Sequence, residues 1–307
     1  MAVSVAEYLG IRTDSPIDII PVAAKSDAMC PFMDRTCDKV SKSLEPVCSV
    51  RKPDGRLWIT CEHRLCSSRN TNKEKNPIGL VKHQQDILLK IAKFIYANEN
   101  LKPHEVGVKR ETTIPLPEAD HSYHADYIMR NFSTKNKVDE ILLEMQGGGE
   151  TSNTKKISDH VRSWAKAPKR SNQQLSIFVG ANTIETNAWR RQQEQFLVKG
   201  NVVDQTGGKI VFAVGTPLYD YLYKRIRHAN LRDLSKHNWT LCLLPIAEDM
   251  EKKIENGPIP MKVDKDRAIF TNYSSFVRFL TDQGCPCPDI FEGDFTLLDN
   301  SKKNIIT

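Results

Sequence analysis

Residues 138–146, VDEILLEMQ, form the stretch that decides the fold of this chain. Val, Ile and Leu dominate it, and a short apolar run of this kind is typical of a buried strand. Because side chains alternate between the two faces of a strand, Glu144 and Gln146 point to the same face. Burying two polar groups in a core strand is costly unless they have partners or a function. The strand therefore predicts a functional site near its carboxyl end.

Further strands and helices are predicted on both sides of this strand. Apolar or alternating patterns predict strands at 105–114, 123–130, 209–215 and 239–246. Helical spacing of apolar residues predicts helices at 77–98, 155–167, 185–199, 217–230 and 273–283, with Gly200 ending the third of them. The first residues, AVSVAEYLG, are predicted as a short helix that ends at Gly10. Strands followed by alternating helices and strands predict an α/β fold with a mixed central sheet flanked by helices.

The bulk composition is that of a globular protein with a mild basic excess. The 307 residues carry a net charge of +6, and the pI is about 8.8. This charge is compatible with a polyanionic partner, although a slightly basic protein without one is the alternative. No apolar run approaches the roughly 20 residues of a membrane helix, and the start of the chain lacks the pattern of a signal peptide. A cytoplasmic protein without a membrane partner is expected.

The cysteines are unevenly distributed, with five of the eight between residues 30 and 66. Clustered cysteines in a reducing compartment indicate metal binding more than disulfides. The spacing is not that of a common zinc ribbon, so buried free thiols are the alternative, and His63 or Cys66 could compete as ligands. The segment 26–75 has little apolar periodicity and would need a metal for stability. We therefore expect a metal-binding module at 1–75 and a separate domain at 76–307.

Acidic residues mark three successive strand candidates. The set comprises Glu111, Asp126, Glu144 and Gln146. Neighbouring strands could bring the carboxylates together on one hard cation such as Mg²⁺, which prefers oxygen ligands and activates water. The acid, acid and polar order is similar to that of the PD-(D/E)xK nucleases, with Gln146 in the place usually held by lysine. The glycine run at 147–149 would let the backbone approach a ligand closely.

Three segments of the cysteine-rich region carry a more specific resemblance. CPFMDRTC, EPVCSV and LWITCEHR, which lie at 30–37, 45–50 and 57–64, resemble the N-terminal metal module of the NotI-type restriction endonucleases. That family holds an iron ion with four cysteines. The resemblance implies that Cys30, Cys37, Cys48 and Cys61 bind iron, or zinc, in a closed structural site.

The resemblance extends to the acidic residues and is strongest up to residue 150. The family has a Glu about fifteen residues before an Asp, then a strand in which glutamine replaces lysine. It therefore implies that Glu111, Asp126, Glu144 and Gln146 are catalytic, with Asp126 and Glu144 holding Mg²⁺. The implied protein is a homodimeric Type II restriction endonuclease that hydrolyses double-stranded DNA at a palindromic, GC-rich site.

Basic residues of the cysteine-rich module are predicted to contact DNA phosphates. They are Arg51, Lys52, Arg56, Arg64 and Arg69. A second basic set beyond the glycine run is the alternative interface, formed by Lys155, Lys156, Lys166, Lys169 and Arg170. Two other functions stay open, namely a related nuclease acting on modified DNA and a non-catalytic nucleic-acid-binding protein. The two polar groups in the strand at 138–146 favour an enzyme over the binder.

Overall fold

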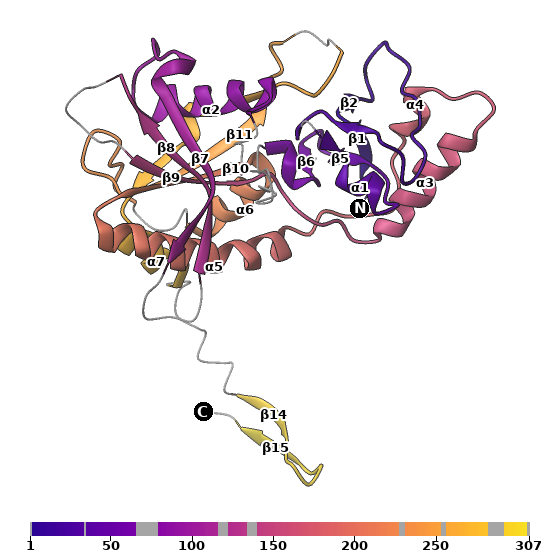
Figure 1. Ribbon diagram of the computed structural model, residues 1–307. Helices are drawn as coiled ribbons and strands as arrows, with labels where there is room; N and C mark the ends of the chain where they lie inside the picture. The colour runs from indigo at the N-terminus through magenta and orange to yellow at the C-terminus, as the bar shows by residue number, and fades with distance from the viewer. Residues whose placement is uncertain are drawn as a thin grey trace.

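The computed structural model consists of a large sheet flanked by helices and a smaller N-terminal sheet beside it (Figure 1). It describes residues 2–33, 35–65, 79–115, 122–133, 140–226, 231–252, 256–281 and 292–305. Within these ranges, no helix has both the length and the apolar character that crossing a membrane requires.

The large sheet is mixed. Its strand order is β12-β11-β10-β9-β8-β7, with β13 also paired to β11. The strands are β7 (Val106–Pro115), β8 (Ser122–Asn131), β9 (Glu140–Gln146), β10 (Lys209–Gly215), β11 (Leu241–Glu248), β12 (Met261–Val263) and β13 (Ile269–Thr271). β9, β10 and β11 run parallel, whereas β7 and β8 form an antiparallel extension at one edge. The prediction of a mixed central sheet in an α/β fold is confirmed, and the five predicted strands lie within two residues of those observed.

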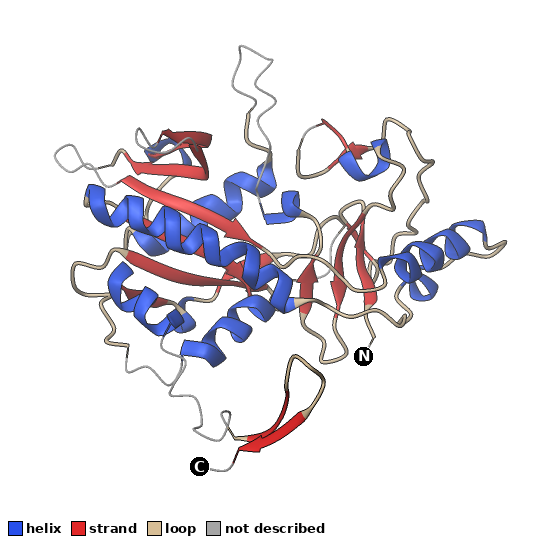
Figure 2. Ribbon diagram, turned by 90° about the horizontal axis from the view of Figure 1, so that it is seen from below, coloured by secondary structure: helices blue, strands red, loops and turns tan. Residues whose placement is uncertain are grey.

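Helices cover both faces of this sheet. α2 (Lys82–Ile95) lies on one face, while α5 (Glu185–Thr206), α6 (Thr216–Ile226) and α7 (Tyr273–Thr281) lie on the other. Figure 2, seen from below, shows the long helix α5 crossing in front of the sheet. Alternation along β9 follows these layers, since Leu143 belongs to the α2 cluster and Leu142 to the α5 cluster. Glu144 and Gln146 share the face of Leu142 and therefore lie under α5.

The helix α5 continues past Gly200, contrary to the prediction that it ends there. It ends instead at Gly207, which adopts a left-handed conformation with φ of 70°. A Cβ at position 200 would come within 2.6 Å of the Tyr273 ring of α7. Gly200 therefore allows a close contact between two helices, which local helix-ending rules do not anticipate.

The N-terminal sheet has the order β2-β1-β5-β6. Its strands are β1 (Ser4–Tyr8), β2 (Ile11–Arg12), β5 (Val47–Arg51) and β6 (Leu57–Ile59). The prediction of a short helix at the start of the chain is therefore wrong. All five residues of β1 are buried, so the strand shows no alternation of polar and apolar residues that would separate it from a buried helix.

Later parts of the chain return to this N-terminal sheet. α3 (Thr154–Lys166) and α4 (Asn172–Leu175) lie next to it in Figure 1. The Trp164 and Tyr8 rings pack edge to face with their centroids 5.5 Å apart, and Val3 bridges to Val179. The N-terminal sheet is therefore stabilised partly by residues from beyond the predicted boundary at residue 75, which itself lies outside the described ranges.

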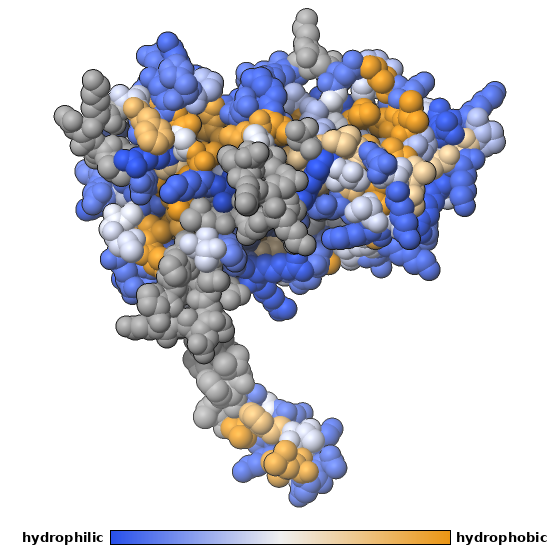
Figure 3. Space-filling view, viewed as in Figure 1, coloured by the Kyte–Doolittle hydropathy of each residue, from blue (hydrophilic) through white to orange (hydrophobic). Residues whose placement is uncertain are grey.

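Short elements complete the described chain. They are β3 (Met29–Cys30), β4 (Arg35–Thr36), α1 (Asp38–Ser41), the 3-10 turns at Glu62–Leu65, Pro103–Glu105 and Lys265–Arg267, β14 (Gly293–Thr296) and β15 (Lys302–Ile305). β14 and β15 pair only with each other in the described structure and project from the body as a hairpin (Figure 1). Figure 3 shows hydrophobic side chains on its surface, and Phe295, Leu297 and Leu298 are exposed there.

Candidate active site

The acidic residues predicted from the sequence fall in one row across three strands. The register of β7 with β8 places Glu111 opposite Asp126, and the register of β8 with β9 places Asp126 beside Glu144. Cross-strand neighbours present their side chains on the same face of a sheet. The side chain of Glu111 lies outside the described part of the structure. The row therefore brings Asp126 and Glu144 together under α5, with the backbone of Glu111 in line.

Asp126 and Glu144 are joined through the backbone of the opposite strand. The amide of Met145 donates to Asp126 Oδ2 at 2.8 Å, and the amide of Asp126 donates to Glu144 Oε1 at 3.4 Å. These bonds orient both carboxylates without neutralising them. Two like charges on adjacent strand positions repel each other, and this repulsion falls when a cation lies between them.

The electrostatic environment of Glu144 is unusual. Its side chain is only 6% exposed. Burial, followed by the charge of Asp126, raises the pKa of Glu144 to about 8, although Lys199 and the amide of Asp126 act in the opposite direction. A raised carboxyl pKa at a partly enclosed position is typical of functional sites. A positive charge next to Glu144 therefore favours the ionised form of its carboxyl group.

Lys199 on α5 supplies such a charge, and the sequence analysis did not identify it. Its Nζ lies 2.6 Å from Glu144 Oε2, and the lysine is only 4% exposed. The spacing of Gln192, Phe196 and Lys199 along α5 places them on one helix face, toward the sheet. Each contacts a residue of β9 or β10, since Gln192 bonds Gln146 and the Phe196 ring packs on Phe212. The sequence signal that could have identified Lys199 is its helical spacing from Gln192, with Phe196 between them on the same face of the helix.

Gln146 is held at both ends of its amide group. Its Oε1 accepts from Gln192 Nε2 at 2.9 Å, and its own Nε2 donates to the carbonyl of Gly148 at 2.5 Å. These two bonds fix the orientation of the amide, which is otherwise free to flip. The side chain is partly exposed and reaches the edge of a cavity. Gln146 therefore presents an amide of fixed orientation at the edge of this cavity.

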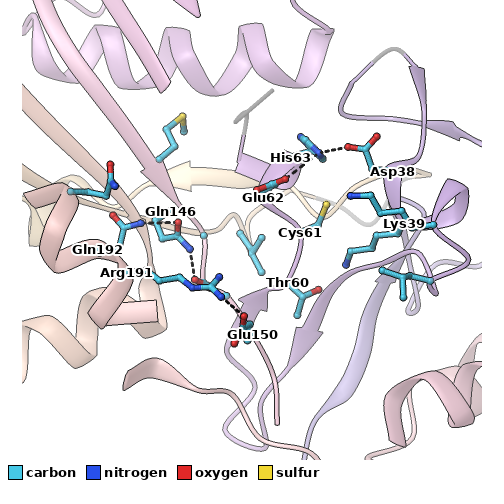
Figure 4. A pocket seen from close by; sticks show the side chains of 18 residues that line it. Asp38, Lys39, Thr60, Cys61, Glu62, His63, Gln146, Glu150, Arg191 and Gln192 are labelled. Carbon is cyan, nitrogen blue, oxygen red and sulfur yellow. Dashed lines mark hydrogen bonds and ion pairs between the residues drawn. The ribbon is translucent and has the colours of Figure 1, made fainter. Parts of the chain in front are cut away.

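The cavity next to Gln146 has a volume of about 390 Å³ and lies between the large sheet and the cysteine-rich module. Figure 4 shows Gln146, Arg191 and Gln192 on one side, with Lys39, Cys61 and His63 from the module on the other. Asp126 and Glu144 are not lining residues of this cavity. Gln146, two residues from Glu144, connects the cavity to the acidic row.

The glycine run at 147–149 packs closely against the strand β6. Gly148 forms a parallel bridge with Ile59 of β6, and a Cβ at position 148 would lie 2.7 Å from the Ile59 carbonyl oxygen. The Gly149 carbonyl accepts from the Trp58 indole at 3.0 Å. The predicted close approach of backbone to a ligand is therefore, in this structure, an approach to β6. The run joins the acidic strand to the cysteine-rich module.

The four cysteines predicted as metal ligands are buried in one cluster. Cys30, Cys37, Cys48 and Cys61 pack with Phe32, Met33 and Val40 in a small core of their own. Cys66, the possible extra ligand, lies outside the described residues. Within the described ranges, no three His, Cys, Asp or Glu side chains are arranged as ligands of one metal ion. The structure thus gathers the four thiols but does not by itself define a coordination sphere.

Each of these thiols accepts a hydrogen bond from a backbone amide. The donors are Phe32 for Cys30, Lys39 and Val40 for Cys37, Gly10 for Cys48 at 3.3 Å, and His63 for Cys61. Backbone N–H groups directed at sulfur favour a thiolate, which is the form that binds metal. Of these four, only Cys37 has a lowered pKa, about 6, through its hydrogen bond with Cys30 and these amides. The hydrogen bond with Cys37 and burial raise the pKa of Cys30, and burial raises the pKa of Cys48 and Cys61. Three of the four cysteines, Cys30, Cys37 and Cys61, have a donor two residues later in the chain. The chemistry of the four thiols, and not their arrangement among the described residues, is therefore what suits them to a metal ion.

The basic residues predicted to contact DNA are engaged within the chain. Arg51 pairs with Glu248, Lys52 with Glu185, and Arg56 with Asp54 and Asp220. Arg64 has no exposed surface and pairs with Glu7, so it is unavailable to DNA in this structure. Arg69 lies outside the described residues. The alternative set is exposed on and beyond α3, namely Lys155, Lys156, Lys166, Lys169 and Arg170.

Comparison with known proteins adds no family to this description. No protein-family model matches the chain, and no curated protein sequence matches it significantly.

Proposed function

We propose that this chain is a Mg²⁺-dependent endonuclease of the Type II restriction class that hydrolyses double-stranded DNA. The observation that carries the proposal is the pair Asp126 and Glu144, which lie side by side on adjacent strands under a buried lysine. A pure nucleic-acid-binding protein has no use for a carboxylate whose pKa is raised by burial and by a second carboxylate beside it. The acidic row and its neighbouring amide match the order expected for a PD-(D/E)xK nuclease.

Asp126 and Glu144 are the residues that would hold Mg²⁺, because their oxygens are the ligands this ion prefers. When bound, the ion lowers the pKa of a water molecule and stabilises negative charge on the phosphate. The raised pKa of Glu144 supports this assignment, since a second cation would relieve the repulsion from Asp126. Glu111, opposite Asp126 in the β7–β8 register, is the third carboxylate proposed for the site.

Gln146 would orient the attacking water or a phosphate oxygen. Its amide is fixed by Gln192 and by the carbonyl of Gly148, so its remaining hydrogen-bonding capacity has a defined direction. An amide carries no charge and cannot act as a general base at neutral pH. Gln146 therefore contributes orientation, and the charge needed near the phosphate must come from elsewhere.

The DNA would contact both parts of the molecule at the cavity beside Gln146. This cavity is lined by the catalytic strand, by α5 and by the cysteine-rich module, including Lys39 and Lys42. We propose that the module positions the DNA, and that the exposed basic residues near α3 add phosphate contacts. Cutting both strands of a palindromic, GC-rich site requires two active sites related by a two-fold axis, so a homodimer is part of the proposal.

The first test is a digest of supercoiled plasmid DNA. We expect purified protein with Mg²⁺ to produce discrete fragments, and EDTA to prevent them because the carboxylates then lack their cation. A parallel digest of methylated plasmid distinguishes an enzyme that acts on modified DNA. Failure to cut either substrate with Mg²⁺ or Mn²⁺, by a folded protein, would overturn the proposed function.

The second test concerns the four thiols. We expect purified, reduced protein to contain about one iron or zinc ion per chain, because four cysteine thiolates form a closed structural site. Cys48→Ser should lose most of this metal and lower the thermal stability, since the local core around the cysteines is small. Elemental analysis of both proteins measures the effect.

The matched control is Cys242→Ala. Cys242 is a free, fully buried cysteine in β11 and lies in the α2-side core, apart from the thiol cluster. This variant should lose stability through its cavity but keep its metal. Fresh wild-type protein without bound metal would contradict the assignment of the four cysteines.

A further inference from the structure

The buried ammonium group of Lys199 lies beside the carboxyl end of β9, a strand end that has no basic residue of its own. The strand β9 ends in Glu144, Met145 and Gln146, and neither Gln146 nor Gln192 brings a charge to this end of the sheet. Lys199 reaches the same face of β9 from α5, with its Nζ 2.6 Å from Glu144 Oε2. The amide of Gln146 therefore comes from β9, whereas the ammonium group of Lys199 comes from α5.

The position of Lys199 is not explained by solvation or by surface ion pairing. Its side chain is 4% exposed, and the α5 turns around it pack into the aromatic cluster of Phe196, Phe212 and Phe276. Burying an ammonium group in such surroundings is costly unless a specific partner compensates for it. Its partner is a residue of the proposed catalytic pair. Lys52, in contrast, pairs with Glu185 at the distant amino end of α5.

The chemistry of phosphodiester cleavage requires a positive charge near the scissile phosphate. Negative charge builds on the phosphate oxygens in the transition state, and preorganised cationic or dipolar groups stabilise it. The amide of Gln146 can donate a hydrogen bond but offers no net charge. The ammonium group of Lys199 lies next to the carboxylate that precedes Gln146 by two residues, on the same face of the sheet.

We propose that Lys199 is a positioning residue of the active site, which holds Glu144 in place and supplies the positive charge that Gln146 cannot. This inference rests on the proposed nuclease function. It adds a residue of α5 to an active site that otherwise consists of residues from the acidic strands. It also predicts that positions 146 and 199 are functionally linked, so that a lysine at either one can serve the site.

The test uses Lys199→Gln, which keeps a hydrogen-bond donor for Glu144 but removes the charge. We expect the single-turnover rate of DNA cleavage to fall by roughly 10²-fold to 10³-fold, the usual effect of deleting one preorganised electrostatic group. Calcium titration followed by calorimetry reports cation binding without turnover. We expect Lys199→Gln to bind Ca²⁺ at least as tightly as wild type, because the two carboxylates remain and a nearby positive charge is gone.

The decisive variant is the double substitution Lys199→Gln with Gln146→Lys, which moves the charge from α5 to β9. We expect the double variant to cleave DNA at least tenfold faster than Lys199→Gln. A lysine with a purely structural role could not be replaced by a lysine on another element. Lys209→Met is the matched control, since Lys209 is a partly buried lysine whose Nζ lies 4.8 Å from the centroid of the Trp239 ring, at the end of β10 away from Glu144. It should cut like wild type.

The outcomes separate this inference from the proposed function. If wild-type protein cuts DNA and Lys199→Gln cuts at the same rate, the role of Lys199 is excluded while the function stands. If Lys199→Gln loses activity together with Ca²⁺ binding, and the double variant is not rescued, Lys199 only maintains the fold of the site and the inference fails. If wild-type protein neither binds Ca²⁺ nor cuts, the proposed function fails and the inference with it.

Discussion

Asp126→Asn and Glu144→Gln should each reduce the rate of DNA cleavage by at least about 10³-fold. Each variant loses several kcal/mol of transition-state stabilisation by a bound metal, and about 1.4 kcal/mol corresponds to a factor of ten in rate. The two carboxylates occupy neighbouring positions on β8 and β9 and cannot replace each other. Binding of DNA in Ca²⁺-free buffer should persist, since removing a negative charge also removes repulsion of phosphate. Single-turnover cleavage and gel-shift titration measure the two effects separately.

Glu140→Gln is the control for these variants. Glu140 lies on the same strand β9 but is exposed, and its carboxylate pairs with Arg130 at 3.3 Å on the surface. Surface pairs of this kind contribute little, so this variant should cut at the wild-type rate. Wild-type cleavage by either Asp126→Asn or Glu144→Gln would exclude the acidic row as the active site.

Arg64→Met should destabilise the folded protein by about 3–5 kcal/mol, because it leaves the Glu7 carboxylate buried without its partner. Neither side chain has exposed surface, and Arg64 Nε lies 2.8 Å from Glu7 Oε2. Ser49 and the amide of Ile259 complete the hydrogen bonds of Glu7, at 2.6 Å and 2.7 Å. The pair thus connects β1, the turn at Glu62–Leu65 and the segment before β12. Urea unfolding followed by circular dichroism measures the loss.

The pH dependence of this loss has a defined sign. Burial alone would raise the pKa of Glu7, but the charge and hydrogen bonds of Arg64 and the bonds from Ser49 and Ile259 lower it below the usual value of a glutamate. Glu7 therefore stabilises the wild-type fold above the unfolded pKa, and this contribution is lost as pH falls through the folded pKa. In Arg64→Met, burial raises the pKa of Glu7. The loss of stability relative to wild type should therefore be largest at neutral pH and become smaller under mildly acidic conditions.

Two variants complete this test. Arg162→Met removes an arginine whose pair with Glu45 is half exposed, and its cost should stay below about 1 kcal/mol. Glu7→Gln combined with Arg64→Met should recover part of the lost stability, since no uncompensated charge then remains buried. A loss below 1 kcal/mol for Arg64→Met alone would mean that the pair does not stabilise the fold.

Sequence patterns predicted the large sheet because the relevant signal is local. Its longer strands show either an apolar run or an alternation of apolar and polar residues, and the helices show apolar residues at helical spacing. The same locality explains the acidic row. Glu144 and Gln146 share a face by simple alternation along β9, and Asp126 joins them through the antiparallel pairing of consecutive strands.

Contacts between distant segments decided the rest, and no local pattern encodes them. β1 is a strand because β5, some forty residues later, provides its hydrogen bonds, and Gly200 lies within a helix because the Tyr273 ring packs on it. Arg64 is basic in the sequence, yet its burial against Glu7 makes it structural. Lys199 becomes part of the site only when α5 folds back over β9, some fifty-five residues apart in the chain. The sequence by itself thus determined the longer strands of the large sheet and the acidic row through short-range periodicity. Tertiary packing alone decided which charges are buried and which of them face Glu144.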